Sequence, residues 1–266
     1  MIGRVLAAAS VAAAFLASDA AAARTLMPHR VVYQLTLEYT TPDSAIANSV
    51  GDLVFQIDDL CDAWSTVTEM RFAVLYDSGQ EARFGTYLSA WESKDGSAYR
   101  FQVKRRSSAG RNEVIEGEAT VPPEGPGEAR FLTPVERNLA LPPDALFPTV
   151  HSLAVLEAAA MGQQLLYHTV FDGTEEESLF EVSTVIMREV PSEEPATLVS
   201  PLLEGLASWR VALAYFEVLD ISNLPRHEAT LRLYENGIID NQLFDFGDFR
   251  LRARMVELTA RDAPTC

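Results

Sequence analysis

"ATLRLYENGIIDNQLFDFGDFRLRARMVEL", residues 229–258, alternates apolar and polar side chains with two interruptions. The first interruption is Asn236-Gly237, a dipeptide that readily adopts the positive φ angles of a two-residue hairpin turn. The second is Gly247-Asp248, a further turn signal. After it, one face of the last run carries Phe249, Leu251, Ala253 and Met255, and the other carries Arg250, Arg252 and Arg254. Alternation with period two places one face on a core and the other in solvent, so this stretch predicts antiparallel strands joined by tight turns.

The same alternation recurs along most of the chain. It is clear in "RVVYQLTLEY" (30–39), "DLVFQID" (52–58) and "WSTVTEMRFAVLY" (64–76). Further strands are predicted at 83–93, 98–106, 113–121, 179–187 and 209–218. Asp95-Gly96 and Asp172-Gly173 predict turns, and the stretches rich in Pro or Gly at 121–128 and 190–201 predict loops.

One segment, "FPTVHSLAVLEAAAMGQ", predicts a helix over about residues 149–161. Thr149 can cap its start, and Gly162 can end it. A single helix among ten or more strands predicts a mostly β fold, an antiparallel β-spiral or open barrel in which the helix covers an end or fills the interior. An outer-membrane barrel fits less well, because outward positions such as Glu69 and Arg71 would put charges into lipid.

The N-terminus has the features of a cleavable export signal. Arg4 precedes a short apolar stretch, and Ala21-Ala22-Ala23 matches the small-residue pattern that signal peptidase cleaves. We therefore predict a signal peptide over residues 1–23, a single domain over 24–266 and a periplasmic protein that does not span the membrane. The formal net charge of −17 argues against nucleic acid and anionic membrane surfaces as partners, because both repel an acidic chain.

The chain has two cysteines, Cys61 and Cys266. In an oxidising compartment the simplest interpretation of such a pair is a disulfide, and two free or intermolecular thiols are the alternative. A bridge would close a loop of roughly 200 residues and would tie down the C-terminus, a stabilisation of about 5 kcal/mol in the chain-entropy model.

A search for catalytic and metal-binding patterns finds none above background. There is no G-x-S-x-G elbow, and His151 and Ser152 are neighbours on a helix and so point in different directions. His29, His168 and His227 have no partner at metal-ligand spacing. The acidic stretches 58–62 and 172–177 do not match a calcium-binding loop. The sequence therefore predicts a protein without catalytic residues, metal or cofactor. Whether the apolar faces form a filled core or a cavity for an acyl chain stays open.

Several segments, in their order along the chain, resemble the EipB-like cell-envelope-integrity family of alphaproteobacterial periplasmic proteins. They are "LMPHRVVYQLTLE" (26–38), Cys61 after "GDLVFQIDDL" (51–60), "WESKDGSAYRF" (91–101), "LPPDALFPTVH" (141–151), "VFDG" (170–173), "LRLYENG" (231–237), "FGDFRLRARMVEL" (246–258) and the terminal Cys266. The resemblance covers essentially all of residues 24–266 and is weakest around 105–140 and 187–208.

The resemblance implies a soluble periplasmic β-spiral, similar in outline to outer-membrane lipoprotein carriers. It also implies a disulfide between Cys61 and Cys266, a role in envelope integrity and no known catalytic residues. The leading hypothesis is a non-catalytic envelope protein that acts through a periplasmic or envelope protein partner. The alternative is a carrier that shelters a lipid or lipoprotein acyl chain, and a hydrolase is the third hypothesis. The leading hypothesis, a protein that acts as a scaffold for a partner, predicts a filled core with an exposed apolar patch. The carrier hypothesis predicts an open apolar cavity.

Overall fold

The computed structural model describes residues 25–110, 112–175, 178–191, 194–218 and 224–266. The described elements are β1 (His29–Thr40), β2 (Ile46–Asp59), β3 (Ala63–Tyr76), β4 (Glu81–Ser93), β5 (Ala98–Ser107), β6 (Asn112–Thr120), β7 (Gly127–Thr133), β8 (Arg137–Leu141), α1 (Pro148–Ala160), β9 (Leu165–Phe171), β10 (Leu179–Glu189), β11 (Ser208–Glu217), β12 (His227–Tyr234), β13 (Ile239–Asp245) and β14 (Phe249–Ala260). The predicted signal peptide, residues 1–23, lies outside the described residues.

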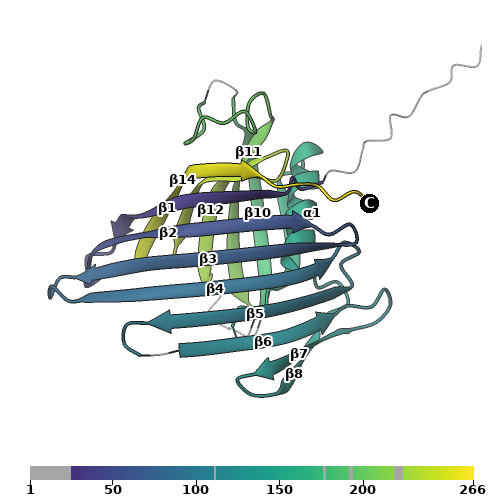
Figure 1. Cartoon of the computed structure of the whole chain (residues 1–266), viewed down its shortest axis with the longest axis horizontal. Coiled ribbons are helices and arrows are strands. Elements are labelled where there is room, and N and C mark those ends of the chain that lie inside the picture. Colours follow the sequence, from purple (N-terminus) through teal and green to yellow (C-terminus); the bar gives the residue numbers. More distant parts are fainter. Residues whose placement is uncertain (1–24, 111, 176–177, 192–193, 219–223) are drawn as a thin grey trace, which may run out of the picture.

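All of these strands belong to one antiparallel sheet, which curls around the helix (Figure 1). Strands that follow one another in sequence are neighbours in the sheet, with the single exception of β8 and β9 among the described strands. The first strand, β1, pairs with the last, β14, and so joins the two ends of the chain. The strands β8 and β9, on either side of α1, are the two edges of the sheet. This arrangement confirms the predicted mostly β fold, an open antiparallel barrel with one helix.

The predicted hairpin at Asn236-Gly237 is confirmed. Gly237 has φ of +83° and connects β12 to β13, and a Cβ at this position would lie 2.4 Å from Leu26 Cδ2. Glycine is therefore favoured here by the positive φ angle, and a larger residue would also force the end of the Leu26 side chain to move. On β14 the predicted core face is also confirmed, because Leu251, Ala253 and Met255 are buried.

Three short strands were not predicted individually: β7, β8 and β9. The loop predicted over 121–128 extends too far, because β7 begins at Gly127. β7 alternates only over a short stretch that begins with glycine, β8 has only five residues, and β9 has no charged residue to mark an outer face, so their sequence signals are weak. Their pairing with neighbouring strands fixes them as β structure, and this information is not local in sequence.

The start of α1 differs from the prediction. Thr149 is not the N-cap; Phe147 occupies that position without a side-chain hydrogen bond, and Pro148 begins the helix. The cap comes instead from Glu92, near the end of β4. Its carboxylate accepts the N–H of Thr149 at 2.8 Å and the N–H of Val150 at 2.7 Å. Proline needs no N–H partner in the first turn, and a carboxylate at this end also meets the positive pole of the helix dipole.

At the other end of α1 the predicted stop is confirmed. Gly162 follows the helix with φ of +73°, and its N–H donates to the carbonyl of Ala159. The N–H of Gln163 donates to the carbonyl of Ala158 at 2.9 Å. These bonds satisfy carbonyls that the end of a helix would otherwise leave without partners.

The inner face of the sheet is packed by side chains. One cluster joins the buried face of α1 to strands on both sides of it, including Trp64, Phe180 and Trp209. A second cluster is aromatic and contains Tyr99, Phe101, Phe131, Phe147 and Phe171, with ring centroids 5.1–6.4 Å apart. Offset and edge-on arrangements at such distances are favourable contacts between aromatic rings. A third cluster lies where β1 meets β14.

The C-terminal tail returns to the beginning of β1. After β14, the N–H of Arg261 donates to the carbonyl of Pro28, and its guanidinium contacts Asp58. Cys266 then reaches Cys61, which lies in the turn between β2 and β3, and the two Sγ atoms are 2.02 Å apart. The tail thus crosses β1 from β14 to the β2–β3 turn. The described residues contain no helix of the length and apolarity needed to cross a membrane.

The predicted bridge is tested by Cys266→Ser. We expect the variant to lose up to about 5 kcal/mol in free energy of unfolding under oxidising conditions, because the unfolded chain regains the entropy of a long loop. Thermal unfolding with and without reductant measures this loss. Cys61→Ser should behave alike, and reductant should lower the wild-type melting temperature to that of the variants. Equal melting of wild type and variants in oxidising buffer would count against the bridge.

The capping role of Glu92 is tested by Glu92→Ala. Removing a buried carboxylate leaves two helix N–H groups without partners, so we expect a loss of about 2–3 kcal/mol in the free energy of unfolding. Glu92→Gln keeps one acceptor oxygen and should lose less. Glu81→Ala, at the exposed start of the same strand, is the control and should change stability by less than about 0.5 kcal/mol. Chemical denaturation provides the comparison, and equal effects of the two alanine substitutions would refute the cap.

Candidate functional site

β9 is one of the two edges of the sheet. β9 pairs with β10 on one side, and on the other side only its end is covered, where Leu146 forms a bridge to Val170. There the carbonyl of Thr169 accepts the N–H of Leu146, and the N–H of Phe171 donates to the carbonyl of Leu146. Backbone groups point to alternate sides along a strand, so those of Tyr167 point to the same free side. An edge of this kind is a template for another strand.

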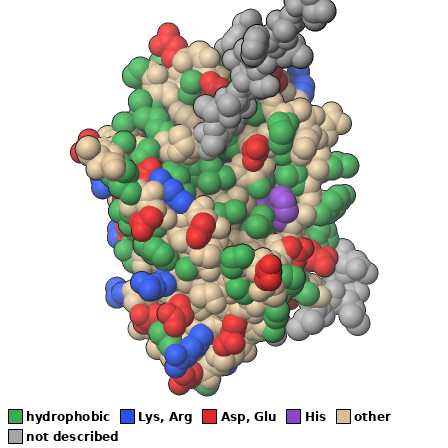
Figure 2. Space-filling model, turned by 90° about the vertical axis from the view of Figure 1, so that its right-hand side faces the viewer, with side chains coloured by type: hydrophobic (Ala, Val, Ile, Leu, Met, Phe, Trp, Pro, Cys, Tyr) green, Lys and Arg blue, Asp and Glu red, His purple; other side chains and the backbone are tan. Residues whose placement is uncertain are grey.

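Apolar side chains are exposed beside this edge. Leu165 is 59% exposed and Tyr167 is 73% exposed, and on β10 Val185 and Met187 are also exposed. Leu165 lies directly opposite Val185 in the ladder. We call these four residues the edge patch. Figure 2 looks onto the end of the molecule at which α1 lies in Figure 1, and it shows apolar side chains exposed among acidic ones.

A cleft of about 560 Å³ adjoins the edge patch over β9, β10 and β11. Its lining includes Tyr167, Phe216 and three carboxylates, those of Asp144, Glu181 and Glu217. Glu217 also contacts Arg226, with Oε1 3.3 Å from Nε. The cleft therefore combines aromatic surface with negative charge, and a ligand with apolar and basic groups would complement it.

Two histidines meet on the inner side of β9. His151 in α1 and His168 in β9 lie edge to face with ring centroids 5.5 Å apart. Within the described residues, His151 Nε2 and His168 Nδ1 are buried and make no hydrogen bond. Burial, together with a smaller effect of the neighbouring His168, lowers the pKa of His151 to about 4. Burial also lowers the pKa of His168, although Asp144 opposes that change. His151 therefore packs as a neutral side chain.

The other residues considered for metal binding are occupied by local contacts. His29 Nδ1 lies 2.7 Å from the carbonyl oxygen of Met27, and His227 stacks on Tyr215 with ring centroids 4.4 Å apart. Among the described residues, no group of three His, Cys, Asp or Glu side chains is arranged to hold a metal ion.

The two acidic stretches build turns. In the first, Asp59 Oδ1 accepts the N–H of Cys61 at 2.8 Å and also pairs with Lys94. In the second, the half-buried Asp172 accepts both the N–H and the hydroxyl of Thr174. Burial raises the pKa of Asp172 to about 6. Residues 176–177 of this stretch lie outside the described residues.

The sequence prediction missed the edge of β9 as a candidate site. The available signal was "LLYHTVF", an apolar run without charges, in which exposed and buried positions look alike. Only the sheet order shows that this strand has no neighbour on one side.

The chain matches the model of the EipB-like family over residues 20–262. It is 29% identical over 272 residues to a protein of Brucella abortus (strain 2308) named cell envelope integrity protein EipB, and the match covers 97% of this chain and 95% of that protein. Its fold is similar to a crystal structure from Brucella abortus, described as a beta-barrel-like protein of domain of unknown function DUF1849. That comparison has a TM-score of 0.83 and 26% identity, and it covers 90% of this chain and all of the other.

The buried His151 predicts a pH dependence of stability. An unfolded histidine binds a proton below a pH of about 6.5, whereas the folded chain does not protonate His151 until about pH 4. The free energy of unfolding should therefore fall as the pH drops from 6.5 to 4, by up to about 3 kcal/mol from this residue. His151→Phe keeps a ring of similar size and cannot titrate, so its stability should fall less over this range. Denaturation curves of both proteins at matched pH values test this, and parallel losses would contradict it.

Proposed function

Because this chain belongs to the EipB-like family, we propose that it supports the integrity of the cell envelope as a non-catalytic periplasmic protein that binds another envelope protein along the free edge of β9. The name of the Brucella relative supports the envelope role. The export signal predicted over residues 1–23, a single folded domain over 24–266 and the Cys61–Cys266 bridge belong to the same proposal.

The observation that carries the proposal is the exposed strand edge with its apolar surface. A strand with free backbone groups binds an extended segment by continuing the ladder of hydrogen bonds, while side-chain pockets beside it select the partner. The amide and carbonyl of Tyr167 supply the backbone groups, and the edge patch supplies apolar contact area. Exposed edges of this kind are otherwise avoided in soluble proteins, because they promote unspecific association.

The negative charge of the chain and of the cleft indicates which kind of partner segment would complement this surface. The chain has a formal net charge of −17, and three of its carboxylates line the cleft beside the edge. A partner segment that is extended, carries an apolar side chain for the edge patch and places Lys or Arg over the cleft would complement both features. Charge complementarity of this type speeds the encounter of two proteins and suppresses wrong partners.

The packing of the inner face gives less support to the alternative, a carrier of a lipid or lipoprotein acyl chain. An acyl chain inside the spiral would have to occupy the space that α1 and the aromatic cluster fill. Phe147 and Phe171 are fully buried, and Gly173 approaches so closely that a Cβ there would lie 2.5 Å from the ring of Phe101. Dense contacts of this kind are the property of a filled core.

The decisive variant is Tyr167→Pro. Proline lacks the N–H that points to the free side, and an edge strand tolerates proline at such a position, so pairing with β10 should survive. In a deletion strain of the encoding organism, we expect wild-type chain and Tyr167→Phe to restore detergent resistance, and Tyr167→Pro to fail at equal protein level and equal melting temperature. Tyr167→Phe is the matched control, because it keeps both the ring and the N–H.

Two outcomes would contradict the proposal. Full restoration by a stably folded Tyr167→Pro would show that the edge is not used. Native mass spectrometry of the protein purified without detergent provides the second readout. An added mass that is lost on denaturation and fragments as an acyl chain would favour the carrier instead.

A further inference from the structure

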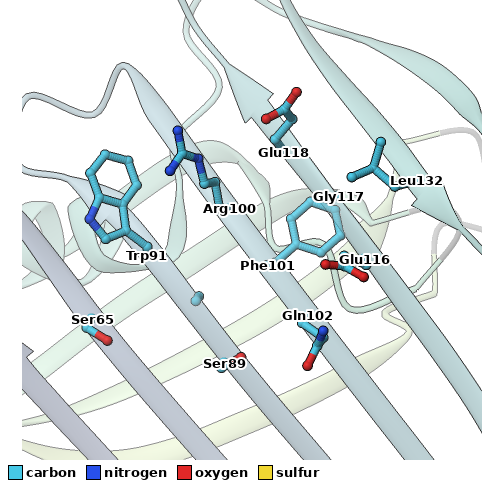
Figure 3. Close-up of a pocket in the computed structure, with 11 residues that line it drawn as sticks. Ser65, Ser89, Trp91, Arg100, Phe101, Gln102, Glu116, Gly117, Glu118 and Leu132 are labelled. Carbon is cyan, nitrogen blue, oxygen red and sulfur yellow. The ribbon is translucent and has the colours of Figure 1, made fainter.

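A second surface, on the outer face of the opposite half of the sheet, has the features of a binding site. It is a groove of about 380 Å³ that crosses β3 to β7 (Figure 3). The strand register places two rows of outward side chains side by side along it. The first row is Ser65, Trp91, Arg100 and Glu118, and the second is Ser89, Gln102 and Glu116. We call these seven residues the groove rows.

A β-bulge shapes one wall of the groove. Glu116 pairs with Thr133 and Gly117 with Phe131, so Leu132 has no partner on β6. The side chain of Leu132 lines the groove and is 43% exposed. Bulges often redirect a side chain in this way, and here the result is an apolar wall beside polar rows.

Within the described residues, the polar side chains of the groove rows make no side-chain hydrogen bonds or ion pairs with the rest of the chain. Arg100 and Glu118 lie directly opposite each other on β5 and β6, yet among the described residues Arg100 makes no ion pair. Its guanidinium instead lies over the ring of Trp91, 5.3 Å from the centroid. Ser89, Gln102 and Glu116 likewise make no side-chain hydrogen bond within the described part of the chain. The groove therefore presents donors and acceptors that are free for a ligand.

Trp91 is the aromatic element of this surface. It is the half-buried tryptophan of the chain, whereas Trp64 and Trp209 are buried in the core. Arg100 covers one face of the indole, and the neighbour on the other side, Ser65, is too small to cover the opposite face. Figure 3 shows the ring standing above the sheet beside Arg100.

We propose that the groove rows bind a saccharide chain. A sugar ring offers a face of C–H groups that packs on an aromatic ring, and hydroxyl groups that need donors and acceptors together. Trp91 matches the first requirement, and Arg100, Gln102, Glu116 and Glu118 match the second, because planar guanidinium, amide and carboxylate groups form paired hydrogen bonds. A simple anion or cation fits less well, because the rows mix one positive charge with two negative ones. A volume of about 380 Å³ lies at the lower end for ligand sites and matches one or two sugar rings.

Isothermal titration calorimetry of the full mature chain with two soluble probes tests the proposal. The probes are chitotetraose, whose rings carry N-acetyl groups, and maltotetraose, whose rings do not. We expect at least one of them to bind the wild-type protein, and Trp91→Ala to weaken that binding by about tenfold or more. Binding should also change the fluorescence of Trp91, since the other two tryptophans are buried away from the groove.

The controls separate this site from the edge of β9. Tyr87→Ala removes another outward aromatic ring of β4, four residues away, and should leave binding unchanged. Tyr167→Pro should also leave it unchanged, so a failure of the protein-binding proposal would not affect this result. No heat of binding with either probe up to about 10 mM, a concentration at which even millimolar affinity saturates, would overturn the proposal. Binding that Trp91→Ala retains in full would overturn it as well.

Discussion

The pairing of β1 with β14 is the constraint on which the rest of the structure depends. Its ladder runs from His29 opposite Ala260 to Thr40 opposite Phe249 and joins the strands that precede α1 to those that follow it. Exposed ion pairs cross the same seam, such as Arg30 with Glu257 at 2.7 Å, but pairs of this kind add little stability in water. The larger contribution comes from apolar burial, because Val31, Tyr33 and Met255 pack in one cluster beneath the seam.

Much of this architecture could be predicted from local sequence. Alternation of apolar and polar residues identified the long strands, and Asn236-Gly237 fixed the hairpin between β12 and β13, because both signals act within a few residues. The cap of α1 could not be predicted in this way. Thr149 has the right chemistry for a cap, but the buried carboxylate of Glu92 arrives from a distant strand and takes that role. The edge of β9 was missed for the same reason, since the absence of a neighbour is a property of the whole sheet.

The two candidate surfaces use the sheet in different ways. Along β9, the backbone itself is the proposed binding element, and the side chains of the edge patch would give it selectivity. In the groove rows, every backbone group is already engaged between neighbouring strands, so only side chains are available. The packed interior makes both surfaces rigid, because α1 and the aromatic cluster support the sheet from inside. A rigid support lowers the entropy that a bound partner has to remove.

The joining of the first strand to the last has a consequence for folding. Synthesis of the chain produces β1 first and β14 last. Until the last residues arrive, β1 can pair with β2 but has an open side, and the early half of the protein is an incomplete sheet with an exposed apolar seam. Non-local pairing of this kind is slow to form and leaves the nascent chain open to aggregation. The seam between β1 and β14 can therefore close only when the whole chain is present, and a chain that lacks β14 keeps one side of β1 unpaired.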